Sequence, residues 1–542
     1  MLPCLIFEDE HLLVANKPAG LNTHAPSPYA GEGLYDWLRH REPRWASLAI
    51  IHRLDKETSG VIVFAKTQAA NRSLTDQFTR RAVHKKYLLL TDRPIPRQPL
   101  TVKSALVRAG EKYLSRPSHA GAEEAETRFL PARQSVGDLF GKFAGVGSHG
   151  AVLAEPLTGR THQIRVHAAE KGFPILGDTL YGGAAATRVY LHAAELTFRH
   201  PATGEEMTFR APADFGADAR LGLRAGLIDP ESTNAYRVIH GASDGWPGWY
   251  VERLGDYLLS QSDQSLAASQ RQHLDRLVET FSARGVYHKL LQRQVRKTKP
   301  AETSPQLVLG EPAPARFPIL ENGLHFELSF AEGYSVGLFL DQRDNRRRML
   351  TGHAGAGFSL FPPGPRSQPL EILNTFAYTC AFSVCAAKAG ARVTSLDLSK
   401  KYLDWGRRNL ALNQIDADGQ DFIYGDAFEW LRRLARKGRR FNVIVLDPPT
   451  FSQSKESGVF RVEKDYGRLV AAALPLLQPE GVLFASANAA DWLPEQFLEQ
   501  LGQAIQTANR RVMQEHYVPQ PPDFPITRQE RGYLKSVWLR VR

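Results

Sequence analysis

Strand-like and helix-like patterns alternate regularly along the carboxy-terminal part of the chain. Short apolar runs such as EILNTF, VTSLDLS, NVIVLDPP and GVLFASA are each separated by a longer segment with helical periodicity. Parallel strands need a crossover connection between them, usually a helix. The alternation therefore predicts a doubly wound, mostly parallel α/β sheet within residues 331–542.

The first 215 residues or so show a different pattern. Runs such as LLVANKP, GVIVFAK and KKYLLLT are short and bounded by Pro, Gly or Asp, with few helices between them. We expect an α+β domain with a mixed or antiparallel sheet over residues 1–217. A small central α/β domain is predicted over 226–330, with an amphipathic helix near 264–284. A chain of 542 residues is too long for one hydrophobic core.

Composition limits the class of protein. Lys and Arg outnumber Asp and Glu by 68 to 57, for a net charge of +11, which favours a polyanionic partner. The three cysteines, Cys4, Cys380 and Cys385, form neither a disulfide framework nor a metal-ligand spacing. The first residues are acidic rather than a positive leader, and no apolar run approaches the ~20 residues of a membrane span. We expect a soluble, cytoplasmic protein.

The run HRLDKETSG at 52–60 is the most informative in the first domain. Alone, an Asp followed by Thr, Ser and Gly is typical of a turn cap. Here it is followed by KKY at 85–87 and LTGRTHQIRVH at 157–167, and it is preceded by NKP at 16–18. Together these runs closely resemble the RluA family of pseudouridine synthases over about residues 5–215.

The resemblance implies a domain that isomerises uridine in structured RNA, with no cofactor and no metal. Asp55 would be the catalytic carboxylate, because breaking and re-forming the glycosidic bond needs an ionised acid beside the sugar. Arg165 would lower its pKa and orient it, and Tyr87 would pack on the unstacked base. The RNA-contacting candidates are Arg53, Arg160 and His162.

Nearby titratable residues have simpler interpretations. Glu57 could act as a second carboxylate, as in glycosidases, but its position varies in the family, which favours a solvated role. His52, His162 and His167 lie in runs that the resemblance explains, so we interpret them as structural or RNA-contacting rather than as metal ligands.

In the last domain, EILNTFAYT at 371–379 predicts a strand that ends in a turn. Asp397 closes the next strand, 23 residues after Asn374. An acid about 20 residues beyond the first turn suits a ribose contact, so NAD is an alternative on this spacing. The glycine-rich phosphate fingerprint is absent, which favours a cofactor without a pyrophosphate.

The run VLDPPTF at 445–451 favours a methyl donor. An Asp-Pro-Pro loop after a buried strand resembles motif IV of methyltransferases acting on base nitrogens, and its prolines stiffen the loop. With DLSKKYLDWGRRNLALN at 397–413 and GLFLDQRDNRR at 337–347, it resembles the large-subunit rRNA methyltransferases of the RlmK and RlmI group over about residues 232–542.

This second resemblance implies a Rossmann-like domain that binds S-adenosyl-L-methionine and methylates an RNA base. Asp397 would contact the ribose, Asp426 would lie near the adenine, and Asp447 would be catalytic. The donor-binding candidates are Asn374, Phe376, Tyr378, Thr379, Asp397, Asp426 and Asp447. Phe451 is an RNA-binding candidate. The chain departs from the family at Thr379-Cys380-Ala381, where relatives often have Thr-Gly-Gly.

The positions of the cysteines limit which atom could accept the methyl group. Methylation of cytosine C5 needs a thiolate that attacks C6, and relatives with that activity carry a cysteine in the loop after the next strand. Here that loop reads ASANA at 485–489, and no cysteine follows Cys385. A ring nitrogen needs only positioning against the sulfonium. We expect guanine N7 of large-subunit rRNA.

Several alternatives remain open at this point. One half could be a catalytically silent RNA-binding platform, or the whole chain a non-enzymatic RNA assembly factor. A small molecule could also receive the methyl group, and the RNA could be rRNA or tRNA. The sequence does not specify the modified nucleotides or the oligomeric state.

Overall fold

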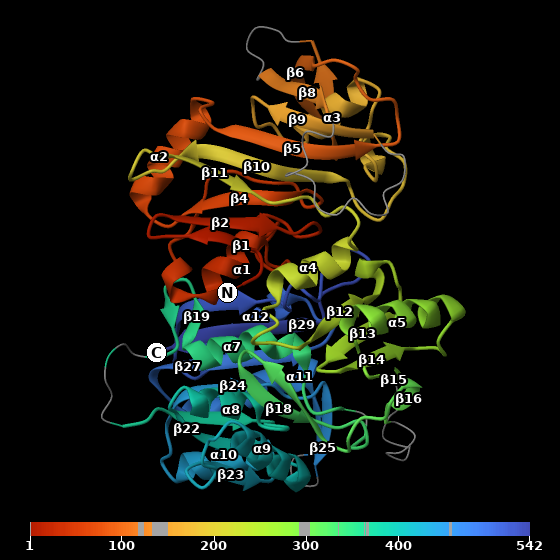
Figure 1. The fold of residues 1–542 in the computed structure, drawn as a ribbon. Coiled ribbons are helices and arrows are strands. Elements are labelled where there is room, and N and C mark those ends of the chain that lie inside the picture. Colours follow the sequence, from red (N-terminus) through yellow and green to blue (C-terminus); the bar gives the residue numbers. More distant parts are fainter. Residues whose placement is uncertain are drawn as a thin grey trace. The chain divides into compact units, whose positions relative to one another are not determined.

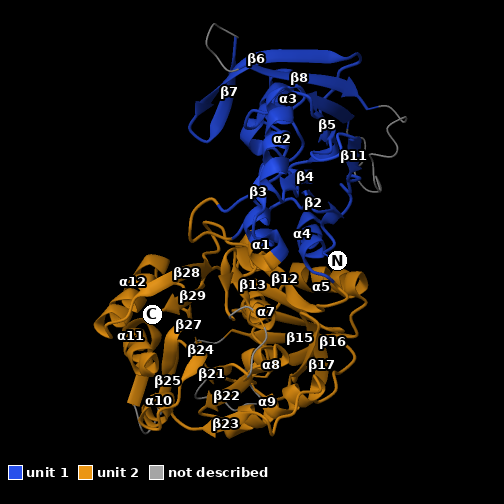
Figure 2. Cartoon of the chain, turned by 90° about the vertical axis from the view of Figure 1, so that its left-hand side faces the viewer, with its two compact units in different colours: residues 1–25, 32–39, 44–229 blue, residues 26–31, 40–43, 230–542 orange. Residues whose placement is uncertain are grey.

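The chain forms two compact units, which Figure 2 colours separately. The structure, a computed structural model, describes residues 2–117, 124–132, 150–291, 304–333, 335–361, 364, 368–454 and 458–542. Unit 1 comprises residues 1–25, 32–39 and 44–229, and unit 2 comprises residues 26–31, 40–43 and 230–542. In the described part of the chain, no helix is long and apolar enough to cross a bilayer.

The elements up to residue 227 can be followed in Figure 1. In chain order they are β1 (Leu5–Glu8), β2 (Leu12–Lys17), α1 (Leu34–Arg41), η1 (Pro43–Trp45), β3 (Ala49–Ile50), β4 (Ser59–Ala65), α2 (Gln68–Thr79), β5 (His84–Thr91), β6 (Leu100–Ala109), β7 (Lys112–Arg116), β8 (Glu124–Pro131), β9 (Gly150–Pro156), α3 (Gln163–Glu170), η3 (Thr179–Tyr181), β10 (Leu191–Arg199), β11 (Glu206–Arg210) and α4 (Ala219–Leu227).

These strands form one mixed sheet in the order β1-β2-β4-β10-β5-β9-β8-β6-β7, with β11 added beside β10 and β3 beside β4. Most neighbours are antiparallel, but β10 runs parallel to β4, which confirms the predicted α+β class. Gly60 makes this pairing possible: its φ is +120°, and a Cβ would lie 2.2 Å from the Ala193 carbonyl oxygen. Only glycine allows so close an approach, and it lies just beyond Asp55.

The elements from residue 235 onward include a small sheet and a larger one. In chain order they are β12 (Ala235–His240), η4 (Gly241–Asp244), β13 (Trp249–Leu254), β14 (Tyr257–Ser262), α5 (Ala268–Phe281), β15 (Gly285–Leu290), β16 (Gln306–Gly310), β17 (Phe317–Glu321), β18 (Leu324–Leu328), η6 (Leu340–Gln342), α7 (Arg343–Thr351), β19 (His353–Gly355), β20 (Phe358–Ser359), β21 (Glu371–Thr375), α8 (Ala381–Lys388), β22 (Arg392–Asp397), α9 (Lys400–Leu412), β23 (Asp421–Tyr424), α10 (Ala427–Arg436), β24 (Phe441–Leu446), β25 (Phe451–Ser454), β26 (Gly458–Arg461), α11 (Val462–Ala473), η7 (Leu474–Leu476), β27 (Leu477–Asn488), α12 (Pro494–Thr507), β28 (Val512–Val518) and β29 (Leu534–Val541).

The larger sheet has the order β23-β22-β21-β24-β27-β29-β28. The strands from β23 to β27 are parallel, and β29 and β28 complete the sheet in antiparallel fashion. The predicted Rossmann-like alternation is thereby confirmed. Strand order reverses between β21 and β24, and at such a switch point the loops after the two strands diverge and open a crevice for a ligand.

Helix α10 illustrates how the sequence sets one crossover. Asp426 is its N-cap, and its carboxylate accepts the Glu429 N–H at 3.0 Å. Phe428, Leu431 and Leu434 recur at helical spacing and are buried in one core cluster. The cap and the apolar face together start the helix directly after the loop that follows β23.

The small sheet, β12-β13-β14-β15-β16, shares a core with the larger one. Leu254 and Tyr257 of the small sheet belong to the same buried cluster as Val443 and Trp538 of the larger sheet. Buried ion pairs add to this packing: Arg346 of α7 forms a two-pronged pair with Glu321 of β17, at 2.6 and 2.7 Å. That residues 226–330 form a domain of their own stays a prediction.

We expect Glu321→Gln to lower the free energy of unfolding by about 3–5 kcal/mol, because it leaves the Arg346 guanidinium buried without its counter-charge. Urea unfolding of the full chain, followed by tryptophan fluorescence, measures the change. Asp404→Asn is the matched control, since Asp404 pairs with Arg407 in solvent, and such pairs contribute about 1 kcal/mol or less. Equal losses in both variants would contradict the prediction.

Candidate functional sites

In unit 1, Asp55 lies in the segment between β3 and β4, and the backbone on both sides of it is held in place. Thr23 Oγ donates to the Leu54 carbonyl at 2.8 Å and accepts the Leu54 N–H at 3.0 Å. The buried Lys17 ammonium donates to the Lys56 carbonyl at 3.3 Å, and burial lowers its pKa to about 7. The Asp55 side chain remains 25% exposed.

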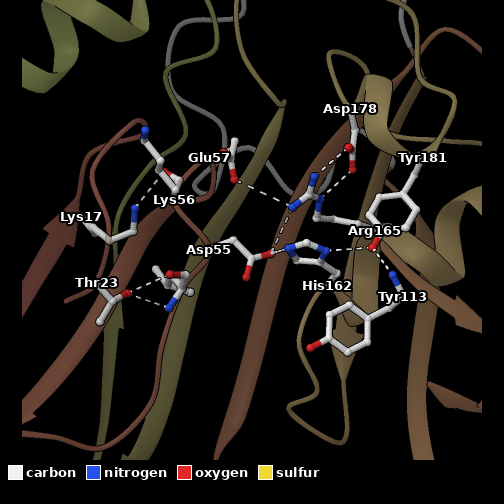
Figure 3. A network of polar contacts seen from close by, with 11 residues as sticks. Lys17, Thr23, Asp55, Lys56, Glu57, Tyr113, His162, Arg165, Asp178 and Tyr181 are labelled. Atoms are coloured by element: carbon white, nitrogen blue, oxygen red, sulfur yellow. Dashed lines mark hydrogen bonds and ion pairs between the residues drawn. The ribbon is translucent and has the colours of Figure 1, made fainter. Parts of the chain in front are cut away.

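Arg165 of α3 faces Asp55 and is itself fixed by a second acid. Its Nη1 lies 3.6 Å from Asp55 Oδ2, and its Nε and Nη2 donate to the two oxygens of buried Asp178 at 2.7 and 2.8 Å (Figure 3). Burial lowers the pKa of the guanidinium, but the hydrogen bonds and charge of Asp178 outweigh it and raise that pKa. Glu57, expected in solvent, is 45% exposed but also lies 3.8 Å from Arg165 Nη1.

His162 lies between Asp55 and Tyr181 (Figure 3). Its Nε2 is 3.9 Å from Asp55 Oδ2, and its Nδ1 is 2.8 Å from the Tyr181 hydroxyl, which accepts the Tyr113 N–H at 2.9 Å. The backbone of His162 has a φ of 56°, a left-handed conformation that costs a non-glycine residue free energy and is common at functional sites. Burial lowers the pKa of His162 and favours its neutral form.

The other residues singled out in this half are placed as follows. Tyr87 of β5 packs against two buried clusters, and burial, together with the charge of Asp55, raises the pKa of its phenol. Arg53 and Arg160 are exposed. His52 stacks on Phe78 and accepts the Val63 N–H, whereas His167 bonds to the hydroxyls of Ser104 and Thr127. Those two histidines therefore have structural contacts.

In unit 2, the turn after β21 contains left-handed residues where glycine would be usual. Phe376, Tyr378 and Cys380 have φ values of 53°, 49° and 61°. The buried side chains of Asn374 and Thr379 support the turn: Asn374 Nδ2 donates to Ser383 Oγ at 2.9 Å, and Thr379 Oγ donates to the Gly337 carbonyl at 2.7 Å. These two side chains are engaged within the protein and support the turn. Any contact of Asn374 or Thr379 with the methyl donor would therefore involve their backbone atoms.

Asp397, at the end of β22, ties that turn to the next loop. Its carboxylate accepts the Tyr378 N–H and the Ser399 N–H, each at 2.8 Å. Burial raises its pKa, although these N–H groups act against the rise. Next to it, Leu398 is 47% exposed and Tyr424, at the end of β23, is 61% exposed. Acidic and apolar groups thus line the same edge of the sheet, and Asp426 caps α10 beside them.

Asp447, directly after β24, is half-buried, and loss of solvation raises its pKa to about 6. Gln342 Nε2 donates to Asp447 Oδ2 at 3.2 Å and to Ser486 Oγ at 2.7 Å. Tyr466 donates its hydroxyl to the Leu446 carbonyl and accepts the Ser486 N–H, each at 2.8 Å. Phe451, expected at the RNA side of the loop, is 40% exposed.

Sequence reasoning gave no role to Gln342, Ser486 or Tyr466. A signal was present for Gln342, because the run LDQRDNRR is strongly polar, yet most of it is buried in the structure. Buried polar residues need partners, so a buried polar run of this kind indicates a network of hydrogen bonds and ion pairs.

Comparison with known proteins places both halves. Residues 11–170 match the family model for RNA pseudouridylate synthase, and residues 257–540 match that for S-adenosylmethionine-dependent methyltransferase. A ribosomal RNA large subunit methyltransferase of Deinococcus radiodurans is 32% identical over 60% of this chain and 78% of its own length. Ribosomal RNA large subunit methyltransferase I of Klebsiella pneumoniae is 32% identical over 59% and 76%.

A solved structure agrees with the methyltransferase match. A methyltransferase crystallised with SAH is 27% identical, covers 59% of this chain and 79% of its own, and has a TM-score of 0.51. Both resemblances inferred from the motifs are confirmed. This chain belongs to the S-adenosylmethionine-dependent methyltransferase family and carries, ahead of that part, an RNA pseudouridylate synthase domain.

Proposed function

We propose that the chain is a bifunctional RNA-modifying enzyme, in which unit 1 isomerises uridine to pseudouridine and unit 2 methylates a base of large-subunit rRNA. One observation carries the proposal. In unit 1 the Asp55 carboxylate faces a fixed cation, and in unit 2 the Asp447 carboxylate faces fixed hydrogen-bond donors. Support for the RNA class comes from the relatives, whose names specify large-subunit ribosomal RNA, and from the net charge of +11.

In unit 1, Asp55 is the catalytic carboxylate. Arg165 Nη1 lies 3.6 Å from the carboxylate and orients it, and Asp178 prevents Arg165 from turning away. The carboxylate lies beside the ribose while the N1–C1′ bond breaks and a C5–C1′ bond forms, and the proton that C5 loses is balanced by one that N1 gains. Tyr87 packs on the target base, and the exposed Arg53 and Arg160, together with His162, contact the RNA.

We expect Asp55→Asn to lower pseudouridine formation by roughly a thousandfold or more, because loss of an essential catalytic group has effects of that size, while methyl transfer is unchanged. Mass spectrometry of nucleosides from RNA treated with the variant measures both products. Glu57→Gln is the matched control and should keep most of the isomerase activity. Full activity of Asp55→Asn would exclude this role.

In unit 2, the residues at the switch point suit S-adenosyl-L-methionine. This edge of the sheet offers a carboxylate at Asp397, exposed apolar side chains at Leu398 and Tyr424, and a turn with three left-handed residues. Asn374, Phe376, Tyr378, Thr379, Asp397, Asp426 and Asp447 are the residues proposed to hold the donor. When bound, the donor supplies an electrophilic methyl group.

Asp447 accepts a hydrogen bond from the target base and, when ionised, offsets the positive charge that the base acquires. Phe451, exposed in β25, is positioned to contact the RNA strand. The acceptor proposed is guanine N7. Cys380 and Cys385 are buried, and burial raises the pKa of Cys380 to about 12 and that of Cys385 as well. Neither thiol can form the thiolate that methylation of cytosine C5 requires.

We expect Asp447→Ala to abolish methyl transfer and to leave pseudouridine formation intact. In the unchanged protein, the rate of methyl transfer should fall as the pH falls through about 6, because burial raises the pKa of Asp447 to that value and the ionised form is the active one. Transfer of tritiated methyl groups to large-subunit rRNA from cells that lack this gene measures methylation and its pH dependence, and mass spectrometry of the nucleosides measures pseudouridine. Normal methylation by Asp447→Ala would exclude the assignment.

We expect the double variant Cys380→Ala/Cys385→Ala to retain methyl transfer within about threefold of the original rate, because a nitrogen acceptor needs no thiolate. The modified nucleoside should be 7-methylguanosine. The RNA product is digested to nucleosides, which are separated by chromatography and identified by mass. This measures both the extent of methyl transfer and the identity of the methylated nucleoside. A 5-methylcytidine product that disappears in the double variant would contradict the proposed acceptor.

A further inference from the structure

Three buried side chains form a series of hydrogen bonds that ends at Asp447. Trp538 Nε1 of β29 donates to Asn345 Oδ1 at 3.1 Å, Asn345 Nδ2 of α7 donates to Gln342 Oε1 at 2.8 Å, and Gln342 Nε2 of η6 donates to Asp447 Oδ2 and to Ser486 Oγ. The exposed fractions of Trp538, Asn345 and Gln342 are 0%, 1% and 4%. We call Trp538, Asn345 and Gln342 the amide relay.

The direction of the amide relay is set at its far end. The indole N–H of Trp538 can only donate, so Asn345 must turn its oxygen toward Trp538. Its nitrogen then faces Gln342 Oε1 and Ser536 Oγ, and Ser536 is a suitable acceptor because its own hydroxyl proton goes to the Val518 carbonyl at 2.7 Å. Gln342 therefore has only its nitrogen left for Asp447.

We infer that Gln342 is a positioning residue for methyl transfer, which the amide relay orients so that an N–H always points at Asp447. The inference rests on the proposed role of Asp447. A donor aimed at one carboxylate oxygen favours the ionised acid and restricts its rotation, so the remaining oxygen is directed at the acceptor base. Any orientation of Gln342 that presents its oxygen instead would repel Asp447.

The other groups around Asp447 show why the hydrogen bond from Gln342 affects its ionisation. Asp341 of η6 acts on Asp447 as a like charge and raises its pKa, whereas Arg346 of α7 lowers it. Ser486 of β27 hydrogen-bonds to the carboxylate and lowers the pKa, and Tyr466 of α11 is a neutral phenol whose own pKa is well above its usual value. Burial, the largest influence, opposes ionisation. Gln342 and Ser486 are thus neutral donors acting against burial and the Asp341 charge.

The test compares Gln342→Met, which keeps the length of the side chain without its donor, with Asn345→Asp, which is isosteric but cannot donate to Gln342. Asn413→Asp is the control, because Asn413 is a buried amide whose partners are the backbone of β18 and α9. Single-turnover methyl transfer to large-subunit rRNA from cells lacking this gene is measured against pH, and binding of S-adenosylmethionine by calorimetry.

We expect the acid limb of the rate profile to move up by about one pH unit in Gln342→Met and Asn345→Asp, since one lost hydrogen bond to a charged group corresponds to a shift of that order. Donor affinity should stay within about twofold, and Asn413→Asp should keep the original limb. Active variants with an unshifted limb would overturn the inference alone. An unchanged protein that transfers no methyl group to RNA would overturn the proposed function and, with it, this inference.

Discussion

Buried guanidinium groups paired with carboxylates hold together the elements that carry both candidate sites. Arg165 joins α3 to Asp178, and Arg346 joins α7 to β17. Arg343, beside Gln342, forms a third two-pronged pair, with Asp523 at 2.9 and 2.6 Å. A planar guanidinium and a carboxylate meet in one relative orientation, and an unpaired buried charge is costly. Each pair therefore fixes the direction of the element from which a functional side chain projects.

The sequence was sufficient to predict the fold class and to select Asp55 and Arg165, which the structure brings together. The alternation of strand and helix patterns predicted the parallel part of the larger sheet, and β21, β22, β24 and β27 all lie where apolar runs were found. Asp55 and Arg165, more than a hundred positions apart, were paired by motif, and the structure places them 3.6 Å apart. A motif can do this because its residue types reflect the chemistry that the site must perform.

The supporting network could not be read from the sequence. Gln342, Asn345 and Trp538 come from η6, α7 and β29, and nothing in their local pattern shows that they converge on Asp447. Local sequence also does not show which way a side chain points. Asn374 and Thr379 were expected at the donor, yet their side chains are bonded to Ser383 and Gly337 beneath the turn.

Asp55 and Asp447 lie in different electrostatic environments. Asp55 is partly exposed and faces a full positive charge, the Arg165 guanidinium, at 3.6 Å. Asp447 lies near another acid, Asp341, and its hydrogen-bond donors, Gln342 and Ser486, are neutral. In the proposed methyl transfer to a ring nitrogen, the base becomes positively charged, and a strong ion pair would compete with that base for Asp447. Neutral donors stabilise the carboxylate without supplying a competing positive charge, which suits the proposed reaction better than a salt bridge would.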